Sequence, residues 1–214
     1  MIGKPVIYRW LIVSVIVFGA IFYAYHLMMN AQPESLSALP VYGVQGADQK
    51  DHTIKAFQLT DQFNNPVSQK DFENKIYVAD FIFTTCEGIC PKMSDQMERV
   101  YENFKGEQDV MFLSHTVKPE EDSIPVLKAY ADMHHVTNDQ WRFVRGDKKV
   151  IYDLARSAYL VADSIGAGGK DDFVHTQFFV LIDTKKRIRG FYDGTDSVEV
   201  NKLIGDIDLL MNGR

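Results

Sequence analysis

The chain has 214 residues, of which 46% are hydrophobic and 24% are charged. This composition is that of a folded globular protein rather than a disordered one, and the length allows one domain of ordinary size with a short additional segment. A formal net charge of −6 argues against nucleic-acid binding, because the phosphate backbone calls for a basic surface.

The N-terminus contains an apolar segment. Residues 10–29 include no Asp, Glu, Lys or Arg, and a helix needs roughly 20 such residues to cross a bilayer. Trp10 at one end and Tyr23 and Tyr25 near the other are typical of membrane interfaces. The alternative is a cleaved signal peptide, whose apolar region is normally shorter and is followed by a small-residue cleavage site. We interpret residues 10–29 as an uncleaved transmembrane helix.

The charges on either side of this segment indicate its orientation. Lys4 and Arg9 precede it, and the first charged residue after it is Glu34. The positive-inside rule therefore predicts that residues 1–9 are cytoplasmic and that the rest of the chain lies outside. Nothing resembling an Arg- and Ser-rich transit peptide precedes the segment. The simplest interpretation is a single-pass protein of a bacterial inner membrane, with its domain on the periplasmic side.

The remainder of the chain predicts a tether followed by an α/β domain. Residues 30–52 contain proline, glycine and polar residues without apolar periodicity, as a tether does. In the domain, residues 53–214, the patterns predict strands at 55–59, 76–83, 109–117, 141–144, 175–183 and 188–192, and helices at 91–105, 122–134, 150–158 and 197–211. This alternation predicts a mixed, mainly parallel sheet with helices on both faces and a closing hairpin. The order of elements is thioredoxin-like.

The chain has only two cysteines, Cys86 and Cys90, which lie four positions apart. In an exported domain a cysteine pair is usually a structural disulfide. A disulfide stabilises mainly by closing a long loop, however, and the loop between these two residues is short. The spacing therefore favours redox or metal chemistry over a structural role.

The sequence around the cysteines, F-T-T-C-E-G-I-C-P-K-M, lies between a predicted buried strand and a predicted helix. Unpaired N–H groups and the dipole at a helix N-terminus favour the thiolate form, which attacks disulfides and binds metals. Pro91 suits the first helical turn. If the segment curls helically, residues four apart point the same way, so both sulfurs could face one ion. Two thiolates favour a soft metal, chiefly copper(I) or zinc.

A metal held by two thiolates needs at least one more ligand. His115 lies near the end of a predicted strand, and His134 and His135 close a predicted helix, where solvated side chains are the usual case. His175 follows a Gly-rich segment and opens a strand that should lie centrally in the sheet. It is the candidate third ligand, and the alternative is a histidine that only makes a hydrogen bond at the strand end. Glu87 offers a carboxylate, which suits copper(I) badly.

Four sequence blocks resemble the Sco/SenC family of copper chaperones for cytochrome oxidase assembly. They are F-x-L-T-D-Q at 57–62, F-T-T-C-x-x-x-C-P-x-M at 83–93, V-K-P-E-x-D-x-x-x-V-L-K-A-Y at 117–130 and D-F-V-H-T-x-x-F-V-L-I-D at 172–183. The resemblance covers about residues 41–210. It implies that Cys86, Cys90 and His175 bind one copper ion per monomer, as Cu(I) or Cu(II). It also implies delivery of this copper to the dinuclear copper centre of cytochrome c oxidase, with the copper-site subunit as acceptor.

The chain departs from the family pattern at two places. The family often has Pro-Asp between the cysteines, where this chain has Glu87 and Gly88, and it usually has Asp at the position of Lys118. Neither change removes an implied ligand, but the second puts any role of that carboxylate in doubt.

Two other functions remain open from the sequence. The first is a membrane-tethered thiol–disulfide oxidoreductase that reduces the cysteines of the oxidase copper site, with Cys86 attacking and Cys90 resolving. Thioredoxin-type enzymes use C-x-x-C and a cis-proline before the closing hairpin, whereas this chain has C-x-x-x-C and no proline after Pro125. The second is an oxidised Cys86–Cys90 bridge in a partner-binding protein. We expect a metallochaperone rather than an enzyme.

Overall fold

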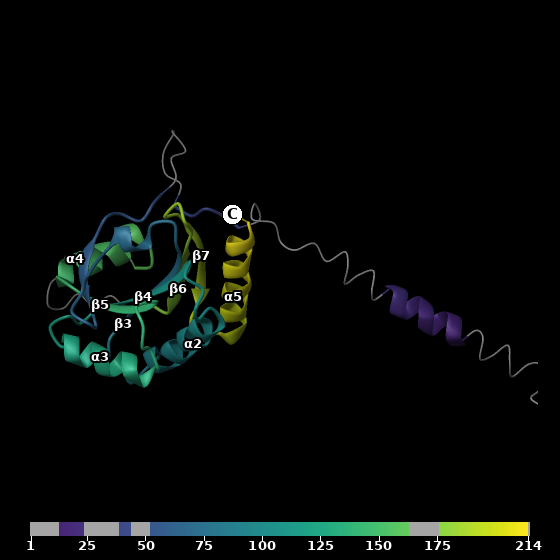
Figure 1. Ribbon diagram of the computed structural model, residues 1–214, viewed down its shortest axis with the longest axis horizontal. Coiled ribbons are helices and arrows are strands. Elements are labelled where there is room, and N and C mark those ends of the chain that lie inside the picture. Colours follow the sequence, from purple (N-terminus) through teal and green to yellow (C-terminus); the bar gives the residue numbers. More distant parts are fainter. Residues whose placement is uncertain (1–12, 24–38, 44–51, 163–175, 214) are drawn as a thin grey trace, which may run out of the picture. The chain divides into compact units, whose positions relative to one another are not determined.

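The computed structural model describes residues 13–23, 39–43, 52–162 and 176–213 (Figure 1). The chain divides into two compact units, Met1–Ser35 and Leu36–Arg214. In the first unit, residues 13–23 form a helix with exposed apolar side chains. None of the helices in the described ranges combines the length and the apolar character needed to cross a bilayer. Residues 10–12 and 24–29 of the predicted transmembrane segment lie outside these ranges, and the segment stays a prediction.

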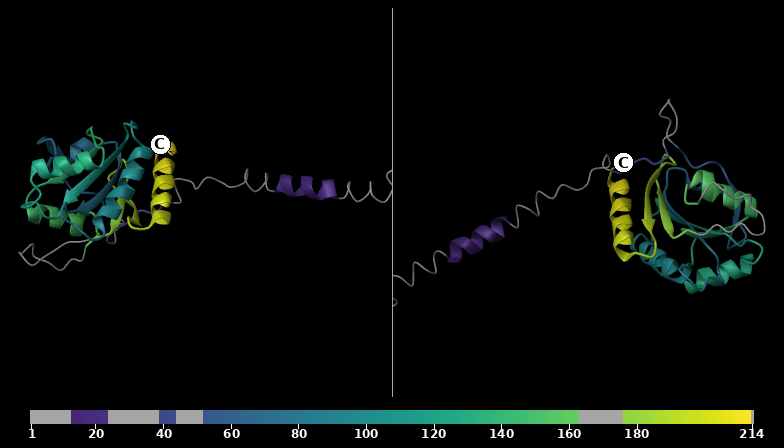
Figure 2. Two further views of the ribbon diagram at one scale, coloured as in Figure 1. Left: turned by 90° about the horizontal axis from the view of Figure 1, so that it is seen from below. Right: turned by 180° about the vertical axis from the view of Figure 1, so that it is seen from behind.

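Within the described residues, the second unit is built around a seven-stranded sheet in the order β2-β1-β5-β4-β3-β6-β7. Figure 2 shows α5, in yellow, beside this sheet. Its strands in chain order are β1 (Gln58–Asp61), β2 (Pro66–Ser68), β3 (Ile76–Ile82), β4 (Val110–Thr116), β5 (Trp141–Arg145), β6 (Phe178–Ile182) and β7 (Ile188–Asp193). The helical elements are η2 (Gln69–Phe72), α2 (Cys90–Asn103), α3 (Ile124–Met133), α4 (Lys148–Asp153), the π-helical turn η3 (Leu154–Ala158) and α5 (Ser197–Asn212).

The sheet is mixed, but the prediction that it is mainly parallel is wrong. Strand β4 pairs in parallel with β3 and with β5. The other four neighbouring pairs that the structure describes are antiparallel. The reason is that each edge of the parallel centre carries a two-stranded antiparallel unit, β1–β2 on one side and β6–β7 on the other. Only the second of these was expected.

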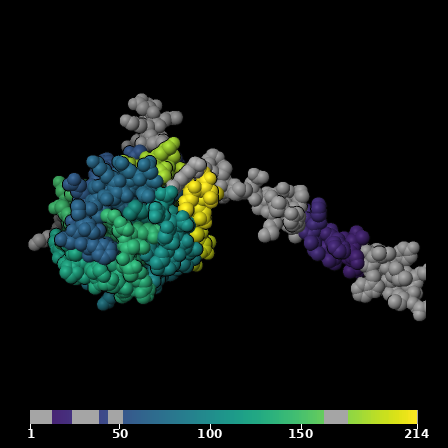
Figure 3. All heavy atoms as spheres, viewed as in Figure 1, coloured from purple at the N-terminus to yellow at the C-terminus, as the bar shows by residue number. Residues whose placement is uncertain are grey.

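Helices cover both faces of the sheet, as predicted. Helices α2, α3 and α5 lie on one face and α4 on the other (Figure 1). Strand β3 is buried along its whole length, and it sends Ile76, Val78 and Ile82 into one core and Tyr77 and Phe81 into the other. This two-sided burial explains why the strand is apolar at every position except Asp80. Figure 3 shows α5, in yellow, at the surface of the unit.

Two local features differ from the prediction. The segment expected as a turn after β1 contains the turn, with Asn64 at φ 66°, but the chain then forms the short strand β2. Asp61 stabilises this turn by accepting hydrogen bonds from the N–H groups of Phe63 and Asn65 at 2.9 and 2.8 Å. The helix expected over 150–158 begins earlier, at Lys148, and its second half is π-helical.

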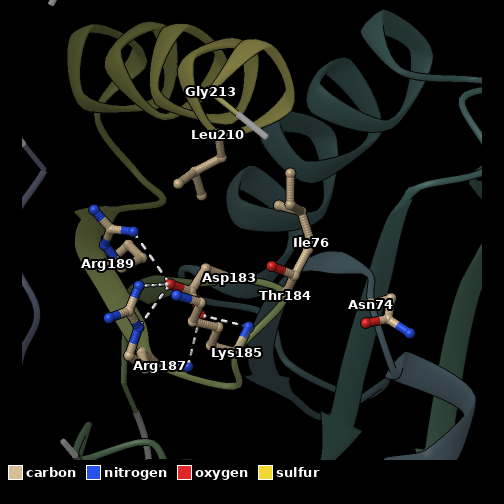
Figure 4. Close-up of a pocket in the computed structure, with 9 residues that line it drawn as sticks. All are labelled: Asn74, Ile76, Asp183, Thr184, Lys185, Arg187, Arg189, Leu210 and Gly213. Carbon is tan, nitrogen blue, oxygen red and sulfur yellow. Dashed lines mark hydrogen bonds and ion pairs between the residues drawn. The ribbon is translucent and has the colours of Figure 1, made fainter. Parts of the chain in front are cut away.

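The N-terminal segment of the second unit is fastened to the sheet by a buried arginine. Arg189 on β7 donates hydrogen bonds to the backbone carbonyls of Pro40 and Leu39 at 3.0 and 2.8 Å. Its guanidinium also pairs with Asp183 at 3.1 Å. These side chains line a pocket beside Ile76, the first residue of β3 (Figure 4). The segment therefore docks at the end of the sheet where β3 begins.

Candidate metal centre

The two cysteines lie at the other end of β3, between the last residue of the strand and the first turn of α2. This is the C-terminal edge of the parallel strands, where ligands of α/β sheets bind. Cys90 is the first residue of α2 and is only 5% exposed, whereas Cys86 precedes the helix and is partly exposed. Neither cysteine forms a disulfide. The predicted placement of the dithiol at a helix N-terminus is confirmed.

The surroundings of Cys86 favour its thiolate. Burial raises the pKa of this thiol, but hydrogen bonds from the Cys90 thiol and from the N–H groups of Cys90, Gly88 and Ile89 outweigh burial, so the net pKa is lowered. A turn holds the residue in place, with its own N–H donating to the carbonyl of Phe83 at 3.2 Å. The start of the helix therefore presents its N–H groups to the Cys86 sulfur.

Cys90 differs sharply from its partner. Burial, followed by its hydrogen bond to the Cys86 sulfur, raises the pKa of Cys90 to about 12, and the charge of Asp80 adds to this rise. The helix N-terminus therefore favours the thiolate at Cys86 but not at Cys90, because Cys90 is buried. The pair therefore contains one thiolate-prone sulfur and one protonated sulfur. A metal that binds both must displace the Cys90 proton.

A buried acid lies on the α2 side of β3, close enough to act on Cys90. Asp80 is 1% exposed, and the hydrogen bond from the Ser114 hydroxyl lowers the pKa of its carboxyl by less than burial raises it. Burial raises the pKa of Asp80 to about 7. The hydroxyl of Tyr130, which bonds Ser94 Oγ at 2.7 Å, also senses this charge, although burial is the main reason that the pKa of Tyr130 rises to about 12. Asp80 was not among the predicted site residues, although it lies inside an apolar run.

A second acid supports the segment that leads to Cys86. Asp122, in the connection between β4 and α3, is fully buried and accepts hydrogen bonds from both the hydroxyl and the N–H of Thr84. Lys118 in the same connection places its ammonium 4.8 Å from the ring centre of Phe83. Asp122 was not among the predicted site residues either, although it falls within the block at 117–130.

The histidines have different fates. His175, the predicted third ligand, lies outside the described residues. His115 is fully buried on the face opposite α2, where its ring stacks on Phe81 at 4.7 Å. The expectation that His134 is solvated is wrong, because the residue is 5% exposed and its Nδ1 lies 3.0 Å from Glu98 Oε2. His135 is exposed, as expected.

Within the described ranges, three potential metal-ligating side chains come together away from the dithiol. One ligand atom from each of Asp95, Glu98 and His134 lies within 4.8 Å of the others. The Nδ1 of His134 already faces Glu98, and its ring packs edge-on against Tyr130 with the ring centres 4.9 Å apart. These contacts account for the group as a link between α2 and α3.

Comparisons with known proteins show the family of this chain. Residues 45–212 match the family model described as SCO1/SenC. The SCO1 protein homolog of Bacillus subtilis (strain 168) is 28% identical over 167 residues, which are 77% of this chain and 86% of that protein.

Solved structures of Sco proteins share the fold. The structure of BsSco, a member of the Sco family of cytochrome c oxidase assembly proteins in which a disulfide switch was identified, is 27% identical and superposes with a TM-score of 0.64 over 76% of this chain and 95% of that one. ScoI of Bradyrhizobium japonicum, solved with copper bound, is 22% identical with a TM-score of 0.59, over 74% of this chain and 99% of that one. The thioredoxin-like α/β fold is thereby confirmed.

Proposed function

Because the chain belongs to the SCO1/SenC family, we propose that it is a membrane-anchored copper-binding chaperone that delivers copper to the dinuclear copper centre of cytochrome c oxidase during assembly. The observation that carries the proposal is the reduced pair of Cys86 and Cys90 at the start of α2. The copper bound by ScoI of B. japonicum and the oxidase-assembly role of the family of BsSco support it.

The chemistry of the two sulfurs suits this cargo. Thiolates are the soft ligands that copper(I) prefers, and the lowered pKa of Cys86 supplies one of them near neutral pH. Because Cys90 holds its proton, binding by both sulfurs releases a proton, so copper affinity should rise with pH. His175 would complete a three-coordinate site for a single ion per monomer. Such an incomplete shell leaves room for a ligand of the oxidase subunit that accepts the copper.

Membrane attachment is part of the proposal. Residues 10–29 contain no Asp, Glu, Lys or Arg, and Lys4 and Arg9 precede them. These features support a single-pass helix in a bacterial inner membrane, with residues 1–9 in the cytoplasm and residues 53–214 as a copper-binding domain on the periplasmic side. Residues 30–52 would join the two, and residues 39–43 of this segment are docked on the domain.

Copper titration of the reduced full-length chain in detergent tests the ligand set. We expect one copper(I) per chain in competition with a chromophoric chelator, and sulfur-to-metal charge-transfer bands with copper(II). His175→Asn should weaken binding by at least about tenfold, since changes even to residues that only support a ligand cost that much. The matched control is His135→Asn, which removes an exposed imidazole and should bind as the wild type does. Unchanged binding by His175→Asn would rule out the proposed third ligand, and unchanged binding by Cys86→Ser would rule out the site.

The unequal pKa values of the two thiols also favour a second candidate, a thiol–disulfide oxidoreductase acting on the cysteines of the oxidase copper site. The Cys86 thiolate would attack the substrate disulfide and form a mixed disulfide. Cys90, after losing its proton, would then attack Cys86, so that two electrons pass from the pair to the substrate, which leaves as two thiols. Turnover of a disulfide substrate should survive His175→Asn and disappear with Cys86→Ser. Loss of turnover in His175→Asn would count against this candidate.

A further inference from the structure

A fully buried carboxylate ties the approach to the dithiol to a neighbouring strand. Asp122 accepts a hydrogen bond from Thr84 Oγ1 at 2.5 Å and one from the Thr84 N–H at 3.3 Å. It also accepts a hydrogen bond from the hydroxyl of Thr116, the last residue of β4. In all three hydrogen bonds the threonine groups donate and the carboxyl oxygens accept, and an ionised carboxylate has acceptors alone to offer. Hydrogen bonds of this charge-assisted kind are the strong ones.

These contacts fix the start of a short path to Cys86. Thr84 lies two residues before Cys86, inside the turn from Phe83 to Cys86. The Cys86 N–H closes this turn by donating to the Phe83 carbonyl at 3.2 Å. Thr116 pairs with Ile82, the last residue of β3. The carboxylate thus joins the ends of two parallel strands at the point where the chain leaves the sheet for the dithiol.

The two sulfurs need different amounts of support. Cys90 belongs to α2 and is held by the buried stripe of that helix, which includes Met93 and Met97. Cys86 precedes the helix in a segment whose residues 87–89 are exposed. The position of Cys86 relative to Cys90 therefore depends on how firmly the segment before it is held.

We propose that Asp122 and Thr84 are positioning residues for the dithiol, which hold the turn so that the Cys86 sulfur stays beside Cys90 and the N–H groups of the helix. The inference rests on the proposed function for its bearing on copper, whereas the geometry of the pair can be tested without metal. Holding two reacting groups together raises their effective concentration, so loosening the turn should disfavour closure of the Cys86–Cys90 disulfide.

The equilibrium with glutathione measures this effective concentration in the full-length chain in detergent. The protein dithiol and oxidised glutathione yield the protein disulfide and two molecules of reduced glutathione, so two electrons leave the pair. This equilibrium compares two folded states. A residue that only stabilises the fold affects the folded dithiol and the folded disulfide equally. Its replacement therefore leaves the equilibrium constant with glutathione (the glutathione constant) unchanged.

Thr84→Val removes the hydroxyl with little change in shape and should lower the glutathione constant by at least about fivefold, as expected for a lost hydrogen bond to a charged group. Thr84→Ser restores the hydroxyl and should return the constant close to the wild-type value. Thr85→Val makes the same change one residue closer to Cys86, at an exposed position, and should have no effect. An unchanged constant in Thr84→Val, or an equal fall in Thr85→Val, would overturn the proposal.

Asp122→Asn provides an independent variant, because an amide cannot accept all three donors equally. It should lower the constant in the same direction as Thr84→Val. If either variant fails to fold, as judged by circular dichroism, Thr84→Ala replaces it under the same criterion.

The outcomes separate this inference from the proposed function. If the wild type binds no copper but Thr84→Val lowers the constant, the positioning role stands and the copper role fails. If the wild type binds copper and Thr84→Val leaves the constant unchanged, the positioning role fails alone.

Discussion

Replacing Asp80 with asparagine should change how the stability of the domain depends on pH. Asp80 on β3 and His115 on β4 are both enclosed by the fold. Burial raises the pKa of Asp80 from 3.8 to about 7 and lowers the pKa of His115 from 6.5 to about 4. The two side chains point to opposite faces of the sheet, and the Nδ1 of His115 lies 3.1 Å from the backbone carbonyl of Asp80.

The two groups act on stability with opposite signs. Between about pH 4 and pH 7, folded Asp80 holds a proton that the unfolded chain has released, so its contribution to stability is lost as pH rises through this range. Between about pH 4 and pH 6.5, His115 is protonated in the unfolded chain but neutral in the folded protein. Its contribution to stability is therefore lost as pH falls. A difference of one in pKa is worth about 1.4 kcal/mol. Over the range the Asp80 contribution therefore changes by about 4 kcal/mol and the His115 contribution by about 3 kcal/mol, so that in the wild type the two largely cancel.

Urea unfolding of the reduced chain, followed by the fluorescence of buried Trp141 at several pH values, measures these slopes. In Asp80→Asn the opposing contribution of Asp80 is absent and that of His115 remains. The free energy of unfolding should therefore rise by on the order of 3 kcal/mol from about pH 4 to pH 7. In His115→Phe, which keeps a ring against Phe81, stability should fall over the same range. Parallel curves for the wild type and Asp80→Asn would refute the assignment of a raised pKa to this carboxyl.

Two further predictions concern the dithiol and the docked N-terminal segment. Iodoacetamide near neutral pH should alkylate Cys86 much faster than Cys90, because the pKa of Cys86 is lowered and that of Cys90 is about 12. Mass spectrometry measures the two alkylation rates, and equal rates would contradict the difference in pKa. Arg189→Met should destabilise the domain by about 1–3 kcal/mol in urea unfolding, because it leaves the carbonyls of Leu39 and Pro40 without this donor, while Asp183 keeps its pair with Arg187. The control Lys128→Met breaks the exposed pair with Asp132 and should cost less than about 1 kcal/mol, and a similar loss in both variants would speak against the buried contact.

The sequence was sufficient for features that depend on local pattern. Strand β3 could be predicted because its residues are apolar on both faces, and the start of α2 because Pro91 follows the cysteine pair. The antiparallel pairing of β3 with β6 could not be predicted, because the apolar periodicity of a strand is the same for parallel and antiparallel neighbours. The burial of His134 depends on Glu98 and Tyr130, which come from two different helices. Such contacts are not visible in the spacing of residues along one helix.

The two acids at the site show where the sequence held more information than its periodicity. Asp80 interrupts an apolar strand, and a charge in a buried strand indicates either a partner or a shifted pKa. Asp122 follows a strand end by six residues, and only the pairing of β3 with β4 brings it beneath Thr84. The first could have been recognised from the sequence, whereas the second required the parallel register.

The docking of the N-terminal segment bears on how the dithiol meets a partner. Arg189 holds Leu39 and Pro40 at the end of the sheet where β3 begins, and the Tyr42 N–H donates to the Ile188 carbonyl at 3.0 Å on the same end. Cys86 follows the opposite end of β3, and a strand of this length extends roughly 20 Å. The described residues 39–43 are thus fixed at a distance from the sulfurs. A protein that receives copper or electrons from the pair would not have to displace them.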